Sequence, residues 1–183
     1  MTGYQEVITD PSYRGQIVAM TYPQIGNYGV NLEDSESAAP HIRAFVIGEL
    51  CEVPSNWRST QPLSEYLAEN KILGIEGIDT RALTKHLRSL GAMRACVTTE
   101  LDAEAAVAAA KASPSMEGMD YVKEVSTPAS YLWTEESREW TLPNVLAKKE
   151  GYHIELPPVR HRIVAYDFGL KYNILRRLRQ AGG

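Results

Sequence analysis

The sequence has few of the features that mark secreted, disulfide-bonded or membrane-spanning proteins. It contains 2 cysteines among 183 residues, which excludes a disulfide framework. No Asn-x-Ser/Thr sequon occurs, and no apolar run approaches the roughly 20 residues that cross a bilayer. Residues 1–6 lack the basic start and apolar stretch of a signal peptide. We therefore expect a cytoplasmic protein with no membrane partner.

The charge balance argues against a nucleic-acid partner. The chain carries 19 Lys+Arg against 23 Asp+Glu, a formal net charge of −4, and 44% of its residues are hydrophobic, which is typical of a soluble globular protein. Local basic patches remain, and each has a plain interpretation as a solvated helix face and an alternative one as a docking surface for an acidic partner. They are Arg81, Lys85 and Arg88 in one segment, and Lys171, Arg176, Arg177 and Arg179 in another.

The usual signatures of cofactor and metal sites are missing. There is no Gly-x-Gly-x-x-Gly, no phosphate-binding Gly-Lys-Ser/Thr loop and no Gly-x-Ser-x-Gly elbow. Asp167-Phe168-Gly169 spells the metal-binding tripeptide of kinases, but none of the accompanying kinase motifs is present. The histidines have no metal-ligand spacing, so we expect no metal and no cofactor in this chain. They are His41, His86, His153 and His161.

Neither cysteine has the surroundings of a nucleophile. A reactive thiolate needs a helix N-terminus or a basic neighbour to lower its pKa. Cys51 precedes Glu52, whose charge disfavours a thiolate, and Cys96 is predicted to pack as a small hydrophobe in the middle of a strand. We expect structural roles for both cysteines and no catalytic residue in this chain.

The pattern of apolar residues predicts a mixed α/β fold. Strands are expected at residues 16–22, 43–50, 93–98 and 162–168. Helices are expected from a cap at Thr60, from a cap at Asp79 or Thr80 to Gly91, over 102–112 and over 172–180. In the second helix, Leu83, Leu87 and Leu90 are predicted to form a buried stripe.

The composition of the sequence changes after about residue 113. Five of the ten prolines fall between 113 and 158, together with Trp133 and Trp140; we interpret this stretch as a connecting segment that packs on something. Paired prolines indicate a domain boundary near Pro157 and Pro158. The last strand and helix form half of a βαβ unit, so we expect the chain to be part of a longer protein.

One short run has the character of an exposed turn. Asp10, Pro11, Ser12 and Tyr13 favour a tight turn that presents the Ser12 hydroxyl to solvent. Because no base adjoins it, chemistry alone would make Ser12 an ordinary turn residue.

Four separate runs, in order, give the sequence a strong resemblance to a known family. They are residues 1–13, 21–29, 77–84 and 164–175. The chain resembles the small, glutaminase chain of carbamoyl-phosphate synthase. The resemblance implies a swivelling β/β/α amino-terminal domain over 1–120 without its opening strands, a linker over 121–160, and over 161–183 the first strand-helix unit of a Rossmann-like class I glutamine amidotransferase domain.

The same resemblance implies the function. In this family the small chain releases ammonia from glutamine through a cysteine, a histidine and a glutamate, and a large chain uses it with bicarbonate and ATP to make carbamoyl phosphate for arginine and pyrimidine biosynthesis. ATP and magnesium are expected in the large-chain partner. The motifs of the catalytic triad have no counterpart here, so the chain by itself is expected to be an inactive part of a ligase. Ser12 matches a glutamine-binding serine of the family.

Two other interpretations stay open at this point. The chain could act as a non-catalytic docking module that holds the glutaminase domain against the large chain. It could also be an unrelated α/β domain whose motif matches arise by chance. A glycine-flanked cysteine and a His-x-Glu run downstream would support the enzymatic interpretation.

Overall fold

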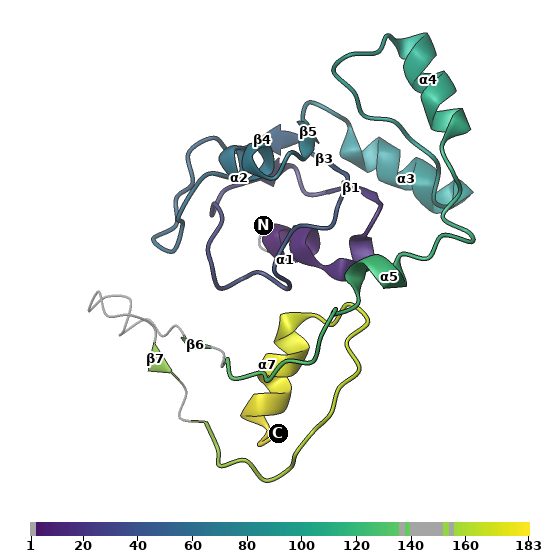
Figure 1. Ribbon diagram of the computed structural model, residues 1–183. Coiled ribbons are helices and arrows are strands. Elements are labelled where there is room, and N and C mark those ends of the chain that lie inside the picture. Colours follow the sequence, from purple (N-terminus) through teal and green to yellow (C-terminus); the bar gives the residue numbers. More distant parts are fainter. Residues whose placement is uncertain (1–2, 136–137, 140–151, 154–155) are drawn as a thin grey trace. The chain divides into compact units, whose positions relative to one another are not determined.

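The computed structural model describes residues 3–135, 138–139, 152–153 and 156–183 (Figure 1). The chain divides into two compact units, Met1–Tyr121 and Val122–Gly183. The predicted role of Trp140 lies outside the described residues, as does the side chain of His153. Each unit is considered by itself below.

Parallel strands form the framework of the first unit. Strands β1 (Ile17–Ala19), β3 (Ala44–Val46) and β5 (Leu73–Ile75) make a sheet in the order β1-β3-β5. Strand β2 (Gln24–Ile25) pairs with β4 (Glu49–Leu50) in a second parallel sheet. Helix α2 (Leu63–Glu69) lies along the chain between β3 and β5 and contacts β5. The parallel sheets and helices confirm the predicted α/β class.

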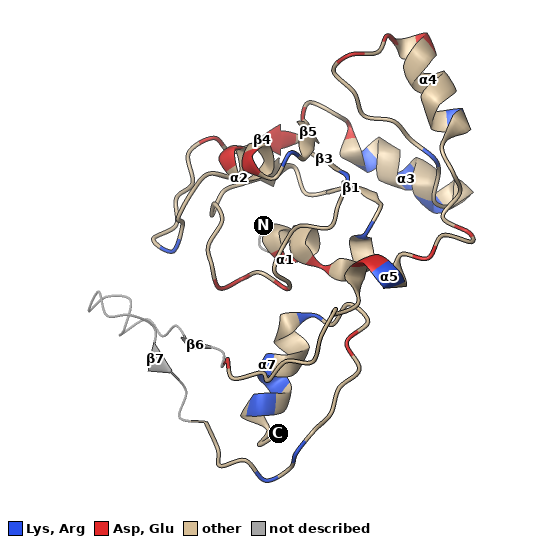
Figure 2. Ribbon diagram, in the orientation of Figure 1, with Lys and Arg blue, Asp and Glu red and all other residues tan. Residues whose placement is uncertain are grey.

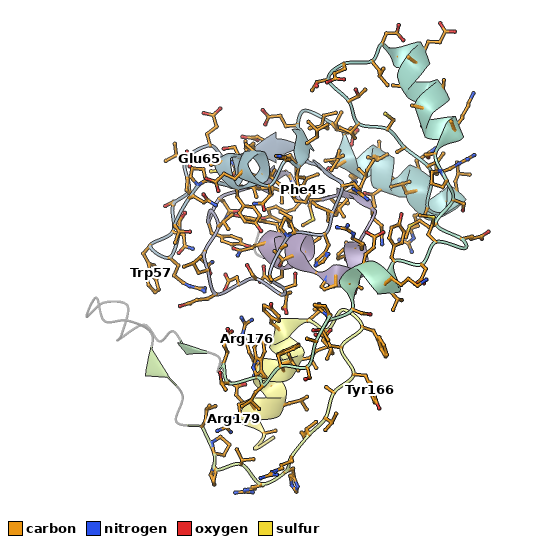
Figure 3. All side chains as sticks on the ribbon, viewed as in Figure 1. Phe45, Trp57, Glu65, Tyr166, Arg176 and Arg179 are labelled. Carbon is orange, nitrogen blue, oxygen red and sulfur yellow. The ribbon has the colours of Figure 1, made fainter. Side chains whose placement is uncertain are left out.

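The core of this unit surrounds helix α1 (Tyr4–Thr9) (Figure 1). Tyr4 and Ile8 on α1 and Phe45 on β3 are completely buried, and Phe45 points into the middle of the unit (Figure 3). Apolar side chains from the strands and α2 complete the same cluster, including Ile25, Leu63 and Leu67. Local pattern does not predict α1, because its six residues, half of them polar, are too few to show a clear helical period.

The strand predicted over 43–50 is two strands, because the chain changes sheets at Gly48. β3 pairs with β1, whereas β4 pairs with β2. A Cβ atom on Gly48 would lie 2.9 Å from the carbonyl oxygen of Pro23, so only glycine lets the two segments approach this closely. The strand predicted over 16–22 is confirmed in its centre, as β1.

Helices α3 (Thr80–Leu90) and α4 (Ala103–Ala112) begin where the sequence places them. Each has an aspartate cap: Asp79 Oδ1 accepts from Ala82 N–H at 2.9 Å, and Asp102 Oδ1 accepts from Ala105 N–H at 2.8 Å. The predicted cap at Thr60 is wrong. Pro62 precedes α2 without a side-chain cap, and the Thr60 hydroxyl instead donates to Val30 O.

Two further predictions are wrong for a shared reason. Leu83 and Leu87 are only half-buried and Leu90 is 64% exposed, so α3 has no buried leucine stripe. Residues 93–98 form no strand, which leaves Cys96 half-buried outside any sheet. An apolar segment becomes a buried stripe or a strand only where a neighbouring element covers or pairs with it.

The described residues of the second unit form four elements of secondary structure. These are helix α5 (Val122–Val125), the antiparallel pair β6 (Arg138–Glu139) and β7 (Tyr152–His153), and helix α7 (Tyr172–Gln180). α7 matches the predicted helix, and Leu175 is its buried residue. The strand predicted over 162–168 is not formed: Val164 is 88% exposed, and Tyr166, at 81%, points outward (Figure 3).

A search of the described residues finds no helix long and apolar enough to cross a membrane.

Replacing Lys71 with glycine is expected to stabilise the first unit. Lys71 has φ of 56° at the end of α2, where its N–H donates to Ala68 O and the Ile72 N–H donates to Leu67 O. This closing turn favours glycine, because a left-handed conformation strains a residue that carries a Cβ. We expect Lys71→Gly to raise the free energy of unfolding in urea by about 1 kcal/mol. The control Lys85→Gly, inside α3, should lower it by a similar amount; a loss in Lys71→Gly would contradict the prediction.

Two apolar segments, residues 163–168 and 44–46, are expected to differ in the protection of their amides against hydrogen exchange. Residues 163–168 pair with no strand among the described residues, whereas Ala44–Val46 lie between β1 and β5. Unpaired amides open at little cost in free energy. Measured on the monomeric chain, residues 163–168 should therefore exchange with little protection and 44–46 with strong protection. Strong protection over 163–168 would show that they have a strand partner.

Candidate functional site

The Ser12 turn has the predicted shape and exposes its hydroxyl. Pro11–Tyr13 form one turn of 3-10 helix immediately after α1. The Ser12 N–H donates to Asp10 Oδ1 at 2.9 Å, so the aspartate side chain closes the turn. Ser12 is exposed, and within the described part of the chain its hydroxyl makes no hydrogen bond. The hydroxyl is thus available to a ligand as donor and as acceptor.

Helix α1 brings the chain to this turn, and a tyrosine from another segment caps its first residues. The hydroxyl oxygen of Tyr28 accepts from Gly3 N–H at 3.1 Å and lies 3.5 Å from Gln5 N. The Tyr28 and Tyr4 rings stack with centroids 4.1 Å apart. Because Gly3 offers no capping side chain, a tertiary contact satisfies the orphan donors of this helix.

A buried glutamine also fixes α1. The Gln5 side chain exchanges two hydrogen bonds with the backbone of Asn31: Oε1 accepts from Asn31 N–H at 2.9 Å, and Nε2 donates to Asn31 O. Gln5 is completely buried, and an unpaired amide there would cost stability. The helix therefore has a single position relative to the loop that follows Tyr28.

Burial changes the ionisation of the groups around α1. Burial raises the pKa of Glu6, and the nearby charges of Asp34 and Glu36 add to the effect. Burial also raises the pKa values of Tyr4 and Tyr28 well above the usual range of a phenol. The Tyr28 hydroxyl lies 3.4 Å from Glu6 Oε2 and can donate to it.

The histidines are dispersed in the described residues. His86 and His161 are exposed. His41 Nε2 lies 3.0 Å from the Ser37 Oγ atom, and burial, followed by the positive charge of Arg14, lowers the pKa of His41. No group of three or more His, Cys, Asp or Glu side chains is placed to hold a metal ion within the ranges that the structure describes.

Among the described residues, neither cysteine is bonded to an imidazole. Cys51 follows β4, is half-buried, and its thiol donates to Val53 O at 3.3 Å. Cys96 is half-buried in the segment that follows α3. Where the structure describes the chain, neither thiol bonds a histidine, so neither has the base that activates a cysteine nucleophile.

The tripeptide that starts at Asp167 closes a turn. Asp167 Oδ1 accepts from the N–H groups of Gly169 and Leu170 at 2.9 and 2.7 Å, and Oδ2 accepts from the Tyr131 hydroxyl at 2.6 Å. Burial alone would raise the pKa of Asp167, but these hydrogen bonds outweigh burial and lower it. Gly169 has φ of 98°, a conformation typical of glycine. The carboxylate therefore has a structural role before α7.

The basic residues of α3 lie on its solvent side. Arg81, Lys85 and Arg88 are all exposed. Figure 2 shows the basic segments along α3, and residues 80–99 include no acidic residue. In α7, Arg176 instead lies over the Tyr172 ring, 5.7 Å from its centroid, and 3.8 Å from Glu135. The structure therefore leaves the α3 face, but not Arg176, open as a docking surface.

Sequence reasoning did not identify the residues that support the Ser12 turn from outside it. These are Tyr28, Gln5, Gln16 and the segment 36–43. Tyr28 lies in a turn over residues 26–29, in which Gly29 N–H donates to Gly26 O at 3.0 Å. Nothing in the local pattern indicated that Tyr28 reaches α1, because that contact joins residues 25 positions apart.

Comparison with known proteins finds close relatives of one kind. Residues 1–97 match the family model described as carbamoyl-phosphate synthase small chain, CPSase domain. The carbamoyl phosphate synthase small chain of Akkermansia muciniphila is 54% identical over 182 residues, which cover 100% of this chain and 46% of the relative. That of Syntrophotalea carbinolica is 52% identical over 179 residues, covering 97% and 46%. That of Synechocystis sp. is 52% identical over 183 residues, covering 100% and 46%. The chain spans about half the length of the curated relatives it matches.

Replacing Glu6 with glutamine is expected to flatten the dependence of stability on pH. The pKa of Glu6 is higher in the folded chain than in the unfolded chain. Its favourable contribution is therefore complete below the unfolded pKa and is lost as the pH rises through the folded pKa. Glu6→Gln removes this titration, so the free energy of unfolding of the variant, relative to that of the parent chain, should increase as the pH rises above the unfolded pKa of a glutamate, about 4.3.

Urea denaturation at a series of pH values checks this expectation. Glu65→Gln, at an exposed position on α2, serves as the matched control for the loss of one carboxylate. A Glu6→Gln profile parallel to that of the parent chain would show that Glu6 does not titrate differently on folding.

Proposed function

Because the chain belongs to the carbamoyl-phosphate synthase small-chain family, we propose that its protein releases ammonia from glutamine and passes it to a large chain. The large chain uses the ammonia with bicarbonate and ATP to form carbamoyl phosphate, which serves arginine and pyrimidine biosynthesis. The family model covers more than half of the chain, and the relatives above carry the small-chain name. These two findings support the proposal.

The proposed architecture follows the family. Residues 1–120 form the swivelling amino-terminal domain, 121–160 a linker, and 161–183 the first strand-helix unit of the Rossmann-like glutamine amidotransferase domain. The compact unit that ends at Tyr121 and the α7 helix that follows the Asp167 turn support this division. The protein acts in the cytoplasm as a heterodimer with the large chain, which binds ATP and magnesium.

The exposed hydroxyl of Ser12 carries the proposal for this chain. It stands on a turn closed by Asp10, directly after the buried helix α1, and no described residue bonds to it. A fixed hydroxyl can bond the charged ammonium or carboxylate group of glutamine. Ser12 is therefore a substrate-binding residue that acts from the amino-terminal domain, while the catalytic groups belong to the amidotransferase domain.

Ser12→Ala is expected to weaken the use of glutamine and leave ammonia-dependent synthesis nearly unchanged. The protein for this test is a hybrid small chain, in which the 183 residues replace the aligned segment of the Akkermansia muciniphila small chain, assembled with the large chain of that organism. Losing one hydrogen bond to a charged group predicts about a 10- to 100-fold fall in kcat/KM for glutamine. The fall should appear mainly in KM if ground and transition states lose the contact equally.

Two results would overturn the role of Ser12. Unchanged glutamine kinetics would leave it as a turn residue, and equal losses with glutamine and ammonia would indicate damaged folding or docking. Ser64→Ala, at an exposed serine on α2, is the matched control and should change neither activity.

The 183-residue chain by itself is expected to have no glutaminase activity. Neither Cys51 nor Cys96 bonds an imidazole in the described parts of the chain, and without an activated nucleophile the covalent route is closed. Ammonia released from glutamine should equal the blank without protein. Release above the blank that Cys51→Ala or Cys96→Ala abolishes would contradict this expectation.

The exposed basic face of α3 favours a second candidate function, a docking module without a role in catalysis. Arg81, Lys85 and Arg88 could bind an acidic surface of the large chain. Under this alternative, Ser12→Ala leaves glutamine kinetics intact, whereas Arg81→Glu combined with Lys85→Glu weakens binding of the large chain. Titrating the large chain into the hybrid small chain and its variants separates the two functions.

A further inference from the structure

Two side chains occupy the backbone polar groups of Ser12 and leave only its hydroxyl unused. The Ser12 N–H donates to Asp10 Oδ1 at 2.9 Å, and the Ser12 carbonyl oxygen accepts from Gln16 Nε2 at 3.0 Å. The serine is thus bonded on both sides of its Cα atom. Because the N–H is taken and the carbonyl oxygen already accepts one bond, the hydroxyl is the polar group of this residue that has no partner among the described residues.

The turn itself has little freedom. Pro11 is buried and fixes its own φ at the start of the 3-10 turn. The Tyr13 N–H donates to Asp10 O at 3.1 Å, and the Arg14 N–H donates to Pro11 O at 3.1 Å. Asp10 is 7% exposed, so its carboxylate has a fixed place from which to bond Ser12.

Both flanks of the turn are bonded to one segment, residues 36–43. Before the turn, the Glu36 N–H donates to Thr9 Oγ1 at 2.9 Å, and the His41 N–H donates to Ile8 O at 2.9 Å. After the turn, the Arg43 N–H donates to Gln16 O at 2.7 Å. Segment 36–43 leads directly into β3, the central strand of the larger sheet. Segment 36–43 therefore connects the Ser12 turn to the core of the unit.

From this arrangement we propose that Asp10 and Gln16 are positioning residues that orient the Ser12 hydroxyl toward glutamine, an inference that rests on the proposed function. Neither side chain needs to touch the substrate. Asp10 sets the direction of the Ser12 Cα–Cβ bond by holding the N–H, and Gln16 does so by holding the carbonyl. A positioned hydroxyl binds its ligand without first losing conformational freedom, which favours tighter binding.

The test uses the hybrid enzyme and measures KM for glutamine together with the ammonia-dependent rate. Asp10→Ala removes the acceptor of the Ser12 N–H and should raise KM for glutamine by about 3- to 30-fold, without exceeding the effect of Ser12→Ala. Asp10→Asn keeps an acceptor oxygen and should recover most of that loss. Gln16→Ala, at a position on the exposed side of the turn, should raise KM by about 2- to 5-fold. The ammonia-dependent rate should stay within about twofold in every variant.

A double-mutant cycle distinguishes positioning from a general structural role. If Asp10 acts through the Ser12 hydroxyl, Asp10→Ala combined with Ser12→Ala should bind glutamine no worse than Ser12→Ala alone. The matched control is Asp102→Ala, which removes an aspartate side-chain cap of the same kind at α4 and should leave KM for glutamine unchanged.

The outcomes separate the inference from the function on which it rests. If Ser12→Ala leaves glutamine kinetics unchanged, the proposed function of Ser12 is wrong. If Ser12→Ala raises KM while Asp10→Ala and Gln16→Ala do not, or if the effects of Asp10→Ala and Ser12→Ala simply add, the positioning inference is wrong and the function of Ser12 stands. Should Asp10→Ala fail to assemble, Gln16→Ala decides the question by the same criteria, alone and in combination with Ser12→Ala.

Discussion

The burial of helix α1 is the constraint on which the first unit depends. A helix of six residues is unstable by itself, because so few hydrogen bonds cannot offset the cost of nucleation. Its stability comes from Tyr4 and Ile8 in the core, from the Tyr28 hydroxyl at its N-terminus and from the buried amide of Gln5. Each of these contacts joins α1 to a segment more than 20 residues away. These contacts link helix α1 to the segments that follow it as far as β3, and the Ser12 turn directly follows this buried helix.

The second unit depends on contacts of another kind. Its strand-like segment 162–168 is unpaired among the described residues, so the turn at Asp167 and helix α7 are held by the segment before them. Thr127 N–H donates to Asp167 O, and the Tyr131 hydroxyl donates to its carboxylate. The Trp133 and Tyr172 rings approach to 4.9 Å between centroids. The segment 127–135, which the sequence analysis interpreted as a connection, thus packs on the start of α7 and belongs structurally to the second unit.

These two arrangements suit a division of labour between the units. A binding group on a rigid turn needs only a precise position, which the network around Asp10 and residues 36–43 supplies. Catalytic groups need an activated nucleophile, a base and a site that excludes water, and the described residues of this chain bring no such set together. Under the proposed function, the first unit contributes substrate recognition through Ser12, and the catalytic groups belong to another part of the protein.

The sequence by itself determined the features that depend on neighbours along the chain. A cap at Asp79 or Thr80 predicted where α3 begins, the alanines of residues 102–112 predicted α4, and the spacing of apolar residues predicted α7. The exposed turn at Ser12 was predicted for the same reason, since Asp10 and Pro11 act within three residues. The motif runs also gave the family.

Only the tertiary structure decided which apolar segments are paired and which side chains support the site. Residues 93–98 and 162–168 have the composition of strands, yet a strand exists only where a second backbone accepts its hydrogen bonds, and composition does not specify that partner. Tyr28, Gln5 and the segment 36–43 act across 20 or more residues, a separation at which local pattern carries no information. Packing therefore determined where the Ser12 turn is held, whereas local sequence determined that its hydroxyl is exposed.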